Sequence, residues 1–210
     1  MWVSKLVLDS RLREVRWAIA NPYALHQALS WAVRDGLERK EERLLWRLEP
    51  TRSMDRPVVL LQTWSRPDWN EVLARWPHFA EIHGPKPFNP VLSPGQRLRF
   101  RLRANPAKRD AAIRKRVALK TPVEKVRWLE DRLRAGGFRL PERDGQRPVR
   151  ILQDVFLRAF KQGHTIRMQA VLFEGVIEVE DPVRARTTLE RGLGPGKAVG
   201  LGLLSVAPGG

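Results

Sequence analysis

The stretch GLGPGKAVGLGL at residues 192–203 combines five glycines with Lys197 and leads into the apolar end of the chain. Glycine loses more conformational freedom on folding than any other residue, so this many in one segment indicate positive φ angles or a close approach to another chain. Successive N–H groups in such a loop can bind an anion, and Lys197 adds a positive charge. The spacing fits neither a P-loop nor a Rossmann turn. We therefore expect a loop that binds a phosphate group through Gly192, Gly194, Gly196, Lys197, Gly200 and Gly202; the alternative is a flexible tail after a helix that ends at Gly192.

The segments before this loop form two similar cycles of secondary structure. In the first, strands are expected at 1–8, 44–48, 57–63 and 80–83, with a helix opened by Asn21-Pro22 and a short one near 67–76. In the second, strands are expected at 96–103, 116–120, 148–160 and 166–179 and after residue 203, with helices at 122–135 and 182–191. The order βαββαβ is that of a ferredoxin-like domain. The sequence therefore predicts an α+β protein with two tandem ferredoxin-like (RRM-like) βαββαβ domains.

The boundary between the two cycles is expected in a segment rich in proline and glycine at 85–95, because such residues mark turns and linkers. We place the N-terminal domain at 1–88, the linker at 89–95 and the C-terminal domain at 96–210.

The charge of the chain points to a polyanionic partner. With 39 Lys and Arg against 23 Asp and Glu, the formal net charge is +16, which favours binding to nucleic acid, with an anionic membrane surface as the alternative. The chain shows no run of apolar residues long enough to span a bilayer and no signal peptide, so we expect a cytoplasmic protein. The absence of cysteine excludes disulfides and cysteine-based metal sites.

A row of arginines is the strongest electrostatic feature. Arg97, Arg99, Arg101 and Arg103 alternate with apolar residues, which on a strand places all four on one face. Like charges at this spacing repel unless a polyanion lies over them. We expect this row to bind RNA, and its alternative is a solvated outer face. The row continues into a basic segment expected to be a loop that becomes ordered with RNA, with the candidate contacts Lys108, Arg109, Arg114 and Lys115.

A second basic cluster surrounds an expected hairpin tip at 160–165. Arg158 and Lys161 are its candidate RNA contacts, joined by His164 and Arg167. A cationic β-hairpin can enter a groove or clamp an RNA stem, and the alternative is an ordinary soluble hairpin end.

The helix that follows Asn21 carries two candidate catalytic residues. His26 and Tyr23, the single tyrosine of the chain, lie off its apolar stripe and share one flank, which Ser30 extends. A histidine exchanges protons near neutral pH, and a helix N-terminus favours phosphate. A lone helical histidine is more often structural than catalytic. The four histidines are dispersed and no carboxylate cluster stands out, so we expect no metal site. If the protein cuts RNA, we expect a route without a metal, in which the 2′-hydroxyl of the RNA attacks the adjacent phosphorus.

With these residues in place, the chain resembles the CRISPR repeat-processing endoribonucleases of the type I-E Cascade complex, the CasE or Cse family of the RAMP superfamily. The resemblance rests on residues 21–30 (NPYALHQALS), on residues 45–49 (LWRLE) and on the glycine-rich loop, and it spans the whole chain.

The resemblance implies two ferredoxin-like domains and metal-independent cleavage of a CRISPR repeat at the 3′ base of its stem-loop, leaving a 5′-hydroxyl and a 2′,3′-cyclic phosphate or 3′-phosphate. It implies His26 as the catalytic histidine, Tyr23 as the assisting tyrosine and no cofactor. The enzyme would stay bound to its product hairpin, beside other Cascade subunits. Family members often carry polar or basic residues after the histidine, where this chain has Trp31, Ala32 and Val33. The stabilising cation is thus unassigned, with Arg34 and Lys161 as candidates.

Two other functions remain open at this stage. A non-catalytic RNA-binding RAMP subunit would share the fold and the charge. A ribosomal or ribosome-associated protein would share the charge without needing Tyr23 and His26.

Overall fold

The structure is a computed structural model and describes residues 1–33, 42–50, 56–109, 116–142 and 147–209. The chain forms two compact units. The first consists of Met1–Pro90 with two later segments, Arg158–Arg167 and Lys197–Gly200; the second contains Val91–Leu157, Met168–Gly196 and Leu201–Gly210. Two short segments from the second half of the sequence therefore fold with the first unit, an arrangement that the expected division at 89–95 did not include.

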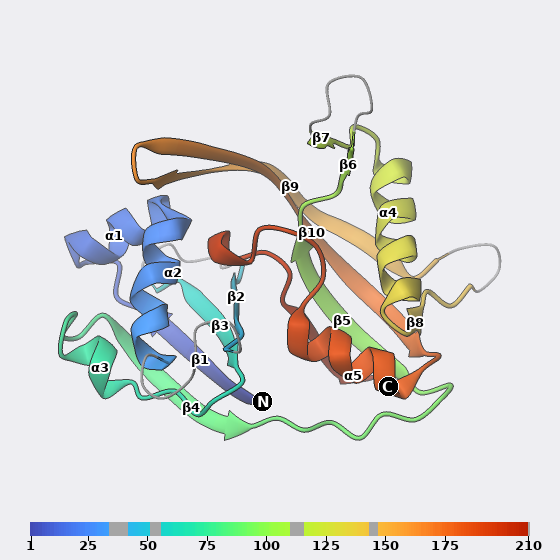
Figure 1. The fold of residues 1–210 in the computed structure, drawn as a ribbon, viewed down its shortest axis with the longest axis horizontal. Helices are drawn as coiled ribbons and strands as arrows, with labels where there is room; N and C mark the ends of the chain where they lie inside the picture. The colour runs from blue at the N-terminus through green and yellow to red at the C-terminus, as the bar shows by residue number, and fades with distance from the viewer. Residues whose placement is uncertain (34–41, 51–55, 110–115, 143–146, 210) are drawn as a thin grey trace. The chain divides into compact units, whose positions relative to one another are not determined.

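The first unit is built on a four-stranded antiparallel sheet of order β2-β3-β1-β4 (Figure 1). Its elements are β1 (Trp2–Leu8), α1 (Arg13–Ala20), α2 (Pro22–Ser30), η1 (Trp31–Val33), β2 (Leu44–Leu48), β3 (Val58–Thr63), α3 (Asn70–Leu73) and β4 (Ala80–Pro87). Apart from the additional helix α1, this order and pairing are those of a ferredoxin-like domain, as predicted. The segment Lys197–Gly200 adds the short helix η2 (Lys197–Val199).

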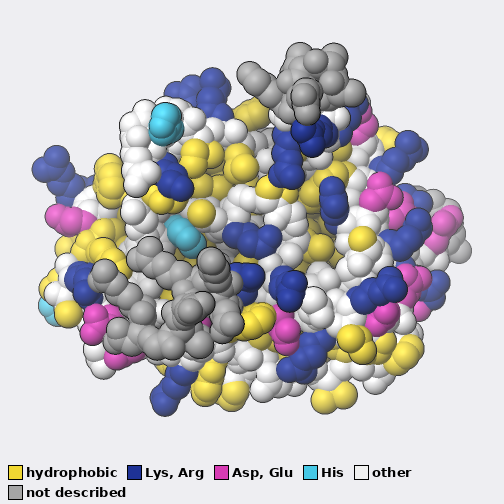
Figure 2. Space-filling view, viewed as in Figure 1, with side chains coloured by type: hydrophobic (Ala, Val, Ile, Leu, Met, Phe, Trp, Pro, Cys, Tyr) yellow, Lys and Arg dark blue, Asp and Glu magenta, His cyan; other side chains and the backbone are white. Residues whose placement is uncertain are grey.

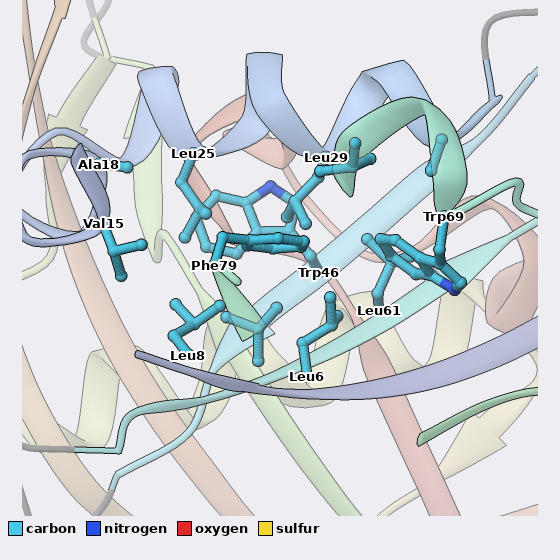
Figure 3. Close-up of a cluster of buried hydrophobic side chains, with 13 residues drawn as sticks. Leu6, Leu8, Val15, Ala18, Leu25, Leu29, Trp46, Leu61, Trp69 and Phe79 are labelled. Atoms are coloured by element: carbon cyan, nitrogen blue, oxygen red, sulfur yellow. The ribbon is translucent and has the colours of Figure 1, made fainter. Parts of the chain in front are cut away.

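The core of this unit lies between the helices and one face of the sheet. Leu25 and Leu29 point from α2 towards Trp46 and Phe79, and Leu6 approaches from the sheet (Figure 3). Their spacing in α2 gives the apolar stripe that the sequence predicted. Because this stripe is buried, the flank of α2 that carries Tyr23 and His26 is turned away from the centre of the core.

Two details of the first unit differ from the prediction. Helix α1 was not predicted; its N-cap position is Leu12, whose side chain makes no cap hydrogen bond, so the usual start signal is missing from the sequence. Asn21 does precede α2 and Pro22 is its first residue, but the Asn21 side chain makes no cap hydrogen bond.

The second unit contains a sheet of order β11-β5-β10-β8, and β9 pairs with β10. Its elements are β5 (Arg97–Ala104), β6 (Ala107–Arg109), β7 (Arg116–Ala118), α4 (Pro122–Ala135), β8 (Phe138–Arg139), β9 (Val149–Lys161), β10 (His164–Val179), α5 (Pro182–Arg191) and β11 (Leu204–Pro208). The tip of the β9–β10 hairpin belongs to the first unit. The expected strand at 116–120 is not part of the main sheet, because β7 pairs with β6 in a separate small hairpin.

Local signals fix both helices of this unit where the sequence predicted them. The Thr121 hydroxyl accepts from the Glu124 N–H at 3.2 Å and the Glu124 carboxylate accepts from the Thr121 N–H at 3.0 Å, which is a capping box. Asp181 caps α5 in a similar way, and Gly192 ends it with φ of 70°. None of the helices in the described part of the chain is long and apolar enough to cross a membrane.

Candidate functional site: a histidine pocket on the first unit

A pocket of about 530 Å³ opens beside α2 in the first unit. It is lined by Tyr23, His26, Gln27, Ser30, Trp31, Val33, Glu42, Arg43, Leu44, Leu45, Lys197 and Ala198. The pocket therefore brings together the flank of α2, the start of β2 and helix η2 from the glycine-rich loop. Two features that the sequence singled out separately, the pair Tyr23 and His26 and the loop residue Lys197, meet here.

His26 and Tyr23 are neighbours on this flank. Their ring centroids are 6.4 Å apart, with the planes inclined by 37°. Nδ1 of His26 is buried and has no hydrogen-bond partner among the described residues. Burial lowers the pKa of His26 from 6.5 to about 4, because an imidazolium loses solvation there. His26 is therefore neutral at pH 7 and has a nitrogen able to accept a proton.

Two lysines bring positive charge to this pair. Lys197 lines the pocket, and its pKa is lowered by burial first and by the positive charge of Arg43 second. Nζ of Lys161, at the hairpin tip, lies 5.3 Å from the centre of the Tyr23 ring. The sequence offered two residues as the cation that stabilises the transition state. Lys161 lies at the site, next to Tyr23. Arg34 falls outside the described residues.

Arg43 and Glu42 line the pocket and were not predicted. The Glu42 carboxylate accepts hydrogen bonds from the N–H groups of Trp64 at 3.0 Å and Ser65 at 3.3 Å, which fixes the start of β2. Arg43 follows directly and donates its own N–H to Glu42 at 3.1 Å. A pair of charged residues before a strand does not by itself indicate a pocket, so these two residues could not be predicted from the sequence.

The glycine-rich loop is ordered and folded against the protein. All five of its glycines have positive φ, between 70° and 94°, as the sequence predicted. The N–H groups of Leu193, Gly200, Leu201 and Gly202 donate to carbonyl oxygens of the chain itself. These four N–H groups are therefore not directed at a phosphate, and a role of Gly192, Gly194, Gly196, Gly200 and Gly202 in RNA binding stays a prediction.

Gly200 lies against an aromatic side chain. A Cβ atom at this position would lie 2.8 Å from the Trp46 ring, which is buried in the core of the first unit. The glycines indicated a close approach to another chain, whereas at Gly200 the close approach is to Trp46 of the same chain.

The arginine row lies on β5 with the alternation that the sequence predicted, because Leu98, Phe100 and Leu102 between the arginines are buried. Two arginines of this row have acidic partners, however. Arg101 forms an ion pair with Glu174, and Nε of Arg97 lies 3.6 Å from Glu178, both acidic residues being on the neighbouring strand β10. Part of the expected repulsion is thus balanced within the sheet.

The other members of the row have different surroundings. Nε of Arg99 donates to the carbonyl oxygen of Pro208 at 3.3 Å, and its side chain is exposed. Arg103 is only partly exposed. Arg99 is therefore the member of this row best placed for a partner.

The remaining basic candidates in the described part of the chain lie on hairpins. Lys108 and Arg109 are exposed on β6, with Nζ of Lys108 3.8 Å from Glu124, while Arg114 and Lys115 lie outside the described residues. Arg158 is exposed near the tip of the β9–β10 hairpin. Lys and Arg side chains are visible over most parts of the face shown in Figure 2.

Among the described residues, no group of three or more His, Asp or Glu side chains is placed to hold a metal ion.

Comparison with known proteins places this chain in a family. The model of the family described as CRISPR associated protein matches residues 1–208. The chain is 59% identical to the CRISPR-associated endoribonuclease Cse3 of Thermus thermophilus, covering 99% of this chain and all of that protein. It is 29% identical to the CRISPR system Cascade subunit CasE of Escherichia coli, again over 99% of this chain and all of that protein.

Among solved structures, the chain is similar to Thermus thermophilus Cse3 bound to an RNA representing a pre-cleavage complex. The TM-score is 0.92 with 60% sequence identity, and the match covers 99% of this chain and 98% of that one.

Proposed function

Because this chain belongs to the family of CRISPR-associated proteins, we propose that it is an endoribonuclease that processes CRISPR precursor RNA. It cleaves the repeat at the 3′ base of its stem-loop and stays bound to the product. The observation that carries this proposal is the pocket in which the neutral His26 lies beside Tyr23 and Lys197. The 59% identity to an endoribonuclease supports the same activity.

The chemistry of this pocket suits attack by the 2′-hydroxyl of the substrate. His26 is neutral and takes the 2′-hydroxyl proton as the oxygen bonds to phosphorus. The bond from phosphorus to the 5′ oxygen breaks, and that oxygen accepts a proton from water and leaves as a hydroxyl, while His26 releases the proton that it took to the solvent. The products are a 2′,3′-cyclic phosphate, which can open to a 3′-phosphate, and a 5′-hydroxyl.

The other groups of the site assist this step. Tyr23 orients the reacting groups through its phenol. The ammonium groups of Lys161 and Lys197 stabilise the negative charge that grows on the phosphate oxygens, since fixed positive charges act most strongly on charge that develops in the transition state. The proposed reaction needs no metal ion and no cofactor.

The partners follow from the same assignment. The similar protein of Escherichia coli is named a Cascade subunit, so we propose that this chain binds the repeat hairpin within such a complex, beside other Cascade subunits, in the cytoplasm. The exposed cations Arg99, Lys108, Arg109 and Arg158 are candidates for RNA phosphate contacts.

The test is single-turnover cleavage of a labelled CRISPR repeat hairpin in EDTA, with both product ends mapped. His26→Ala should lower the rate by ~10²–10⁴-fold and leave the dissociation constant of the hairpin within a few-fold. Tyr23→Phe should lower the rate less, because an orienting phenol contributes less than the group that takes the proton. His83→Ala is the matched control, because His83 is exposed on β4, lies 3.0 Å from Glu81 and does not line the pocket.

Cleavage by His26→Ala within about tenfold of wild type would rule out its role. Tight binding without any cleavage by the wild-type protein would indicate a non-catalytic RNA-binding subunit instead.

A further inference from the structure

The side chain of Asn21 holds the backbone of the hairpin tip. Its Oδ1 accepts a hydrogen bond from the N–H of Phe160 at 2.9 Å, and its Nδ2 donates to the carbonyl oxygen of Phe160 at 3.4 Å. The Asn21 residue is 5% exposed, and all these atoms belong to the first unit. The carboxamide thus pairs with both polar groups of one residue, as a neighbouring strand would.

This pairing determines which side chains of the tip face α2. Successive side chains of a strand point to opposite sides, so Ala159 and Lys161 share one side and Phe160 lies on the other. Ala159 is 1% exposed, whereas Phe160 is 58% exposed. The Lys161 ammonium lies 5.3 Å from the centre of the Tyr23 ring. Tyr23 is two residues after Asn21 in the sequence.

Lys161 depends on this arrangement for its place. A lysine has a flexible four-carbon stem, and its attraction to the face of a tyrosine at an exposed site is weak. A shift of the strand by one residue would turn Lys161 to the opposite side. The two hydrogen bonds from Asn21 prevent such a shift, because they fix Phe160, the residue next to Lys161.

We propose that Asn21 is a positioning residue for the cleavage reaction: its carboxamide fixes the backbone of Phe160 and thereby holds Lys161 over Tyr23 at the scissile phosphate. This inference rests on the proposed function for its catalytic consequence. The structural part of this inference, that Asn21 orders the hairpin tip, does not depend on the proposed function.

The competing explanation is that Asn21 serves α2 as an N-cap. Asparagine and serine are both good N-caps and alanine is not, but a serine side chain is too short to replace both bonds to Phe160. The variants Asn21→Ala and Asn21→Ser therefore separate the two roles. If Asn21 fixes the hairpin, both variants lose activity alike; if it only caps the helix, Asn21→Ser keeps wild-type activity, which would overturn the proposal.

The first experiment is a double-mutant cycle with Lys161→Ala, measured by single-turnover cleavage of the repeat hairpin. Asn21→Ala alone should lower the rate by ~10- to 100-fold, the size of effect that misplacement of a reacting group produces, with the dissociation constant within about threefold. In the Lys161→Ala background the Asn21→Ala change should lower the rate by less than about threefold, because both changes remove the same contribution, that of the Lys161 ammonium group. Equal effects in both backgrounds would mean that Asn21 does not act through Lys161.

The second experiment needs no cleavage and so separates this inference from the proposed function. Hydrogen exchange of the tip amides, measured on the protein without RNA, should be at least ~10-fold faster for Phe160 in Asn21→Ala and Asn21→Ser than in wild type. Asn70→Ala is the matched control, since Asn70 is an exposed asparagine at the start of α3. Unchanged exchange at Phe160 in both Asn21 variants would overturn the inference even if the enzyme cleaves RNA, whereas a wild type that cuts no repeat RNA would overturn the proposed function alone.

Discussion

At the scale of single residues, the charge state of His26 decides what it can do. Burial lowers its pKa to about 4, so the neutral form predominates at every pH above that value. A neutral imidazole has one unprotonated ring nitrogen, which can accept the proton of a 2′-hydroxyl. This favours His26 as the base of the reaction in the free enzyme.

The pH dependence of cleavage tests this assignment. The value of kcat/KM reports the ionisation of the free enzyme, so the contribution of His26 should rise as the pH passes about 4 and stay constant from about pH 5 to pH 8. The measurement is single-turnover cleavage at low protein concentration across that range, with folding followed by circular dichroism. A tenfold fall in kcat/KM for each pH unit above pH 5 would identify a required protonated group and contradict the assignment.

The sequence predicted where His26 lies on α2 but not which group the Asn21 side chain bonds to, and the reason lies in the range of the interactions. His26 lies off the buried stripe of α2, and helical spacing alone gives that position. Asn21 was predicted to cap α2, but its side chain bonds to Phe160 instead, 139 residues away in the chain. A local pattern identifies a capable N-cap and gives no information about a more distant strand that competes for the same carboxamide.

At the scale of secondary structure, the glycine-rich loop gives a prediction about packing. Gly200 has φ of 79°, and an added Cβ would lie 2.8 Å from the Trp46 ring. Gly200→Ala should therefore suffer both backbone strain and a clash, and clashes of this kind in packed interiors cost about 1–3 kcal/mol. Gly163→Ala is the matched control, because Gly163 has φ of 80° with nothing within 4 Å of its added Cβ.

The measurement is thermal or urea unfolding of both variants beside wild type. Gly163→Ala carries only the cost of a left-handed backbone, about 1–2 kcal/mol, and Gly200→Ala should lose clearly more. Equal losses in the two variants would show that Trp46 relaxes freely and that Gly200 is not needed for packing.

Helix and strand limits were predictable where their signals are local. Helices α4 and α5 begin directly after Thr121 and Asp181 because these N-cap side chains bond to N–H groups of the first turn that follows. Helix α1 lacks such a cap and was not predicted. The strand expected at 116–120 is present as β7 (Arg116–Ala118), but its pairing with β6 was not predicted, because the sequence of a strand does not show which other strand it pairs with.

At the scale of the whole molecule, the net charge of +16 is large, but individual cations differ in how free they are to meet RNA. Arg101 is paired with Glu174, and contact with a phosphate would require it to leave that carboxylate. Arg99 is exposed and donates to a backbone carbonyl oxygen, which a phosphate can replace at a smaller loss. Position in the sheet, rather than residue type, should therefore decide which arginines bind RNA.

The salt dependence of hairpin binding distinguishes these two arginines. Each RNA phosphate neutralised by a protein cation contributes roughly 0.7 to 0.9 to the slope of log K against log salt. Arg99→Gln should reduce the slope by about that amount, while Arg101→Gln should reduce it by less than about half as much. The measurement is the dissociation constant of the repeat hairpin over a series of KCl concentrations, with thermal melting to show that both variants fold. An unchanged slope in Arg99→Gln would assign the arginine row to a solvated face, and equal reductions in both variants would mean that Glu174 yields Arg101 to RNA.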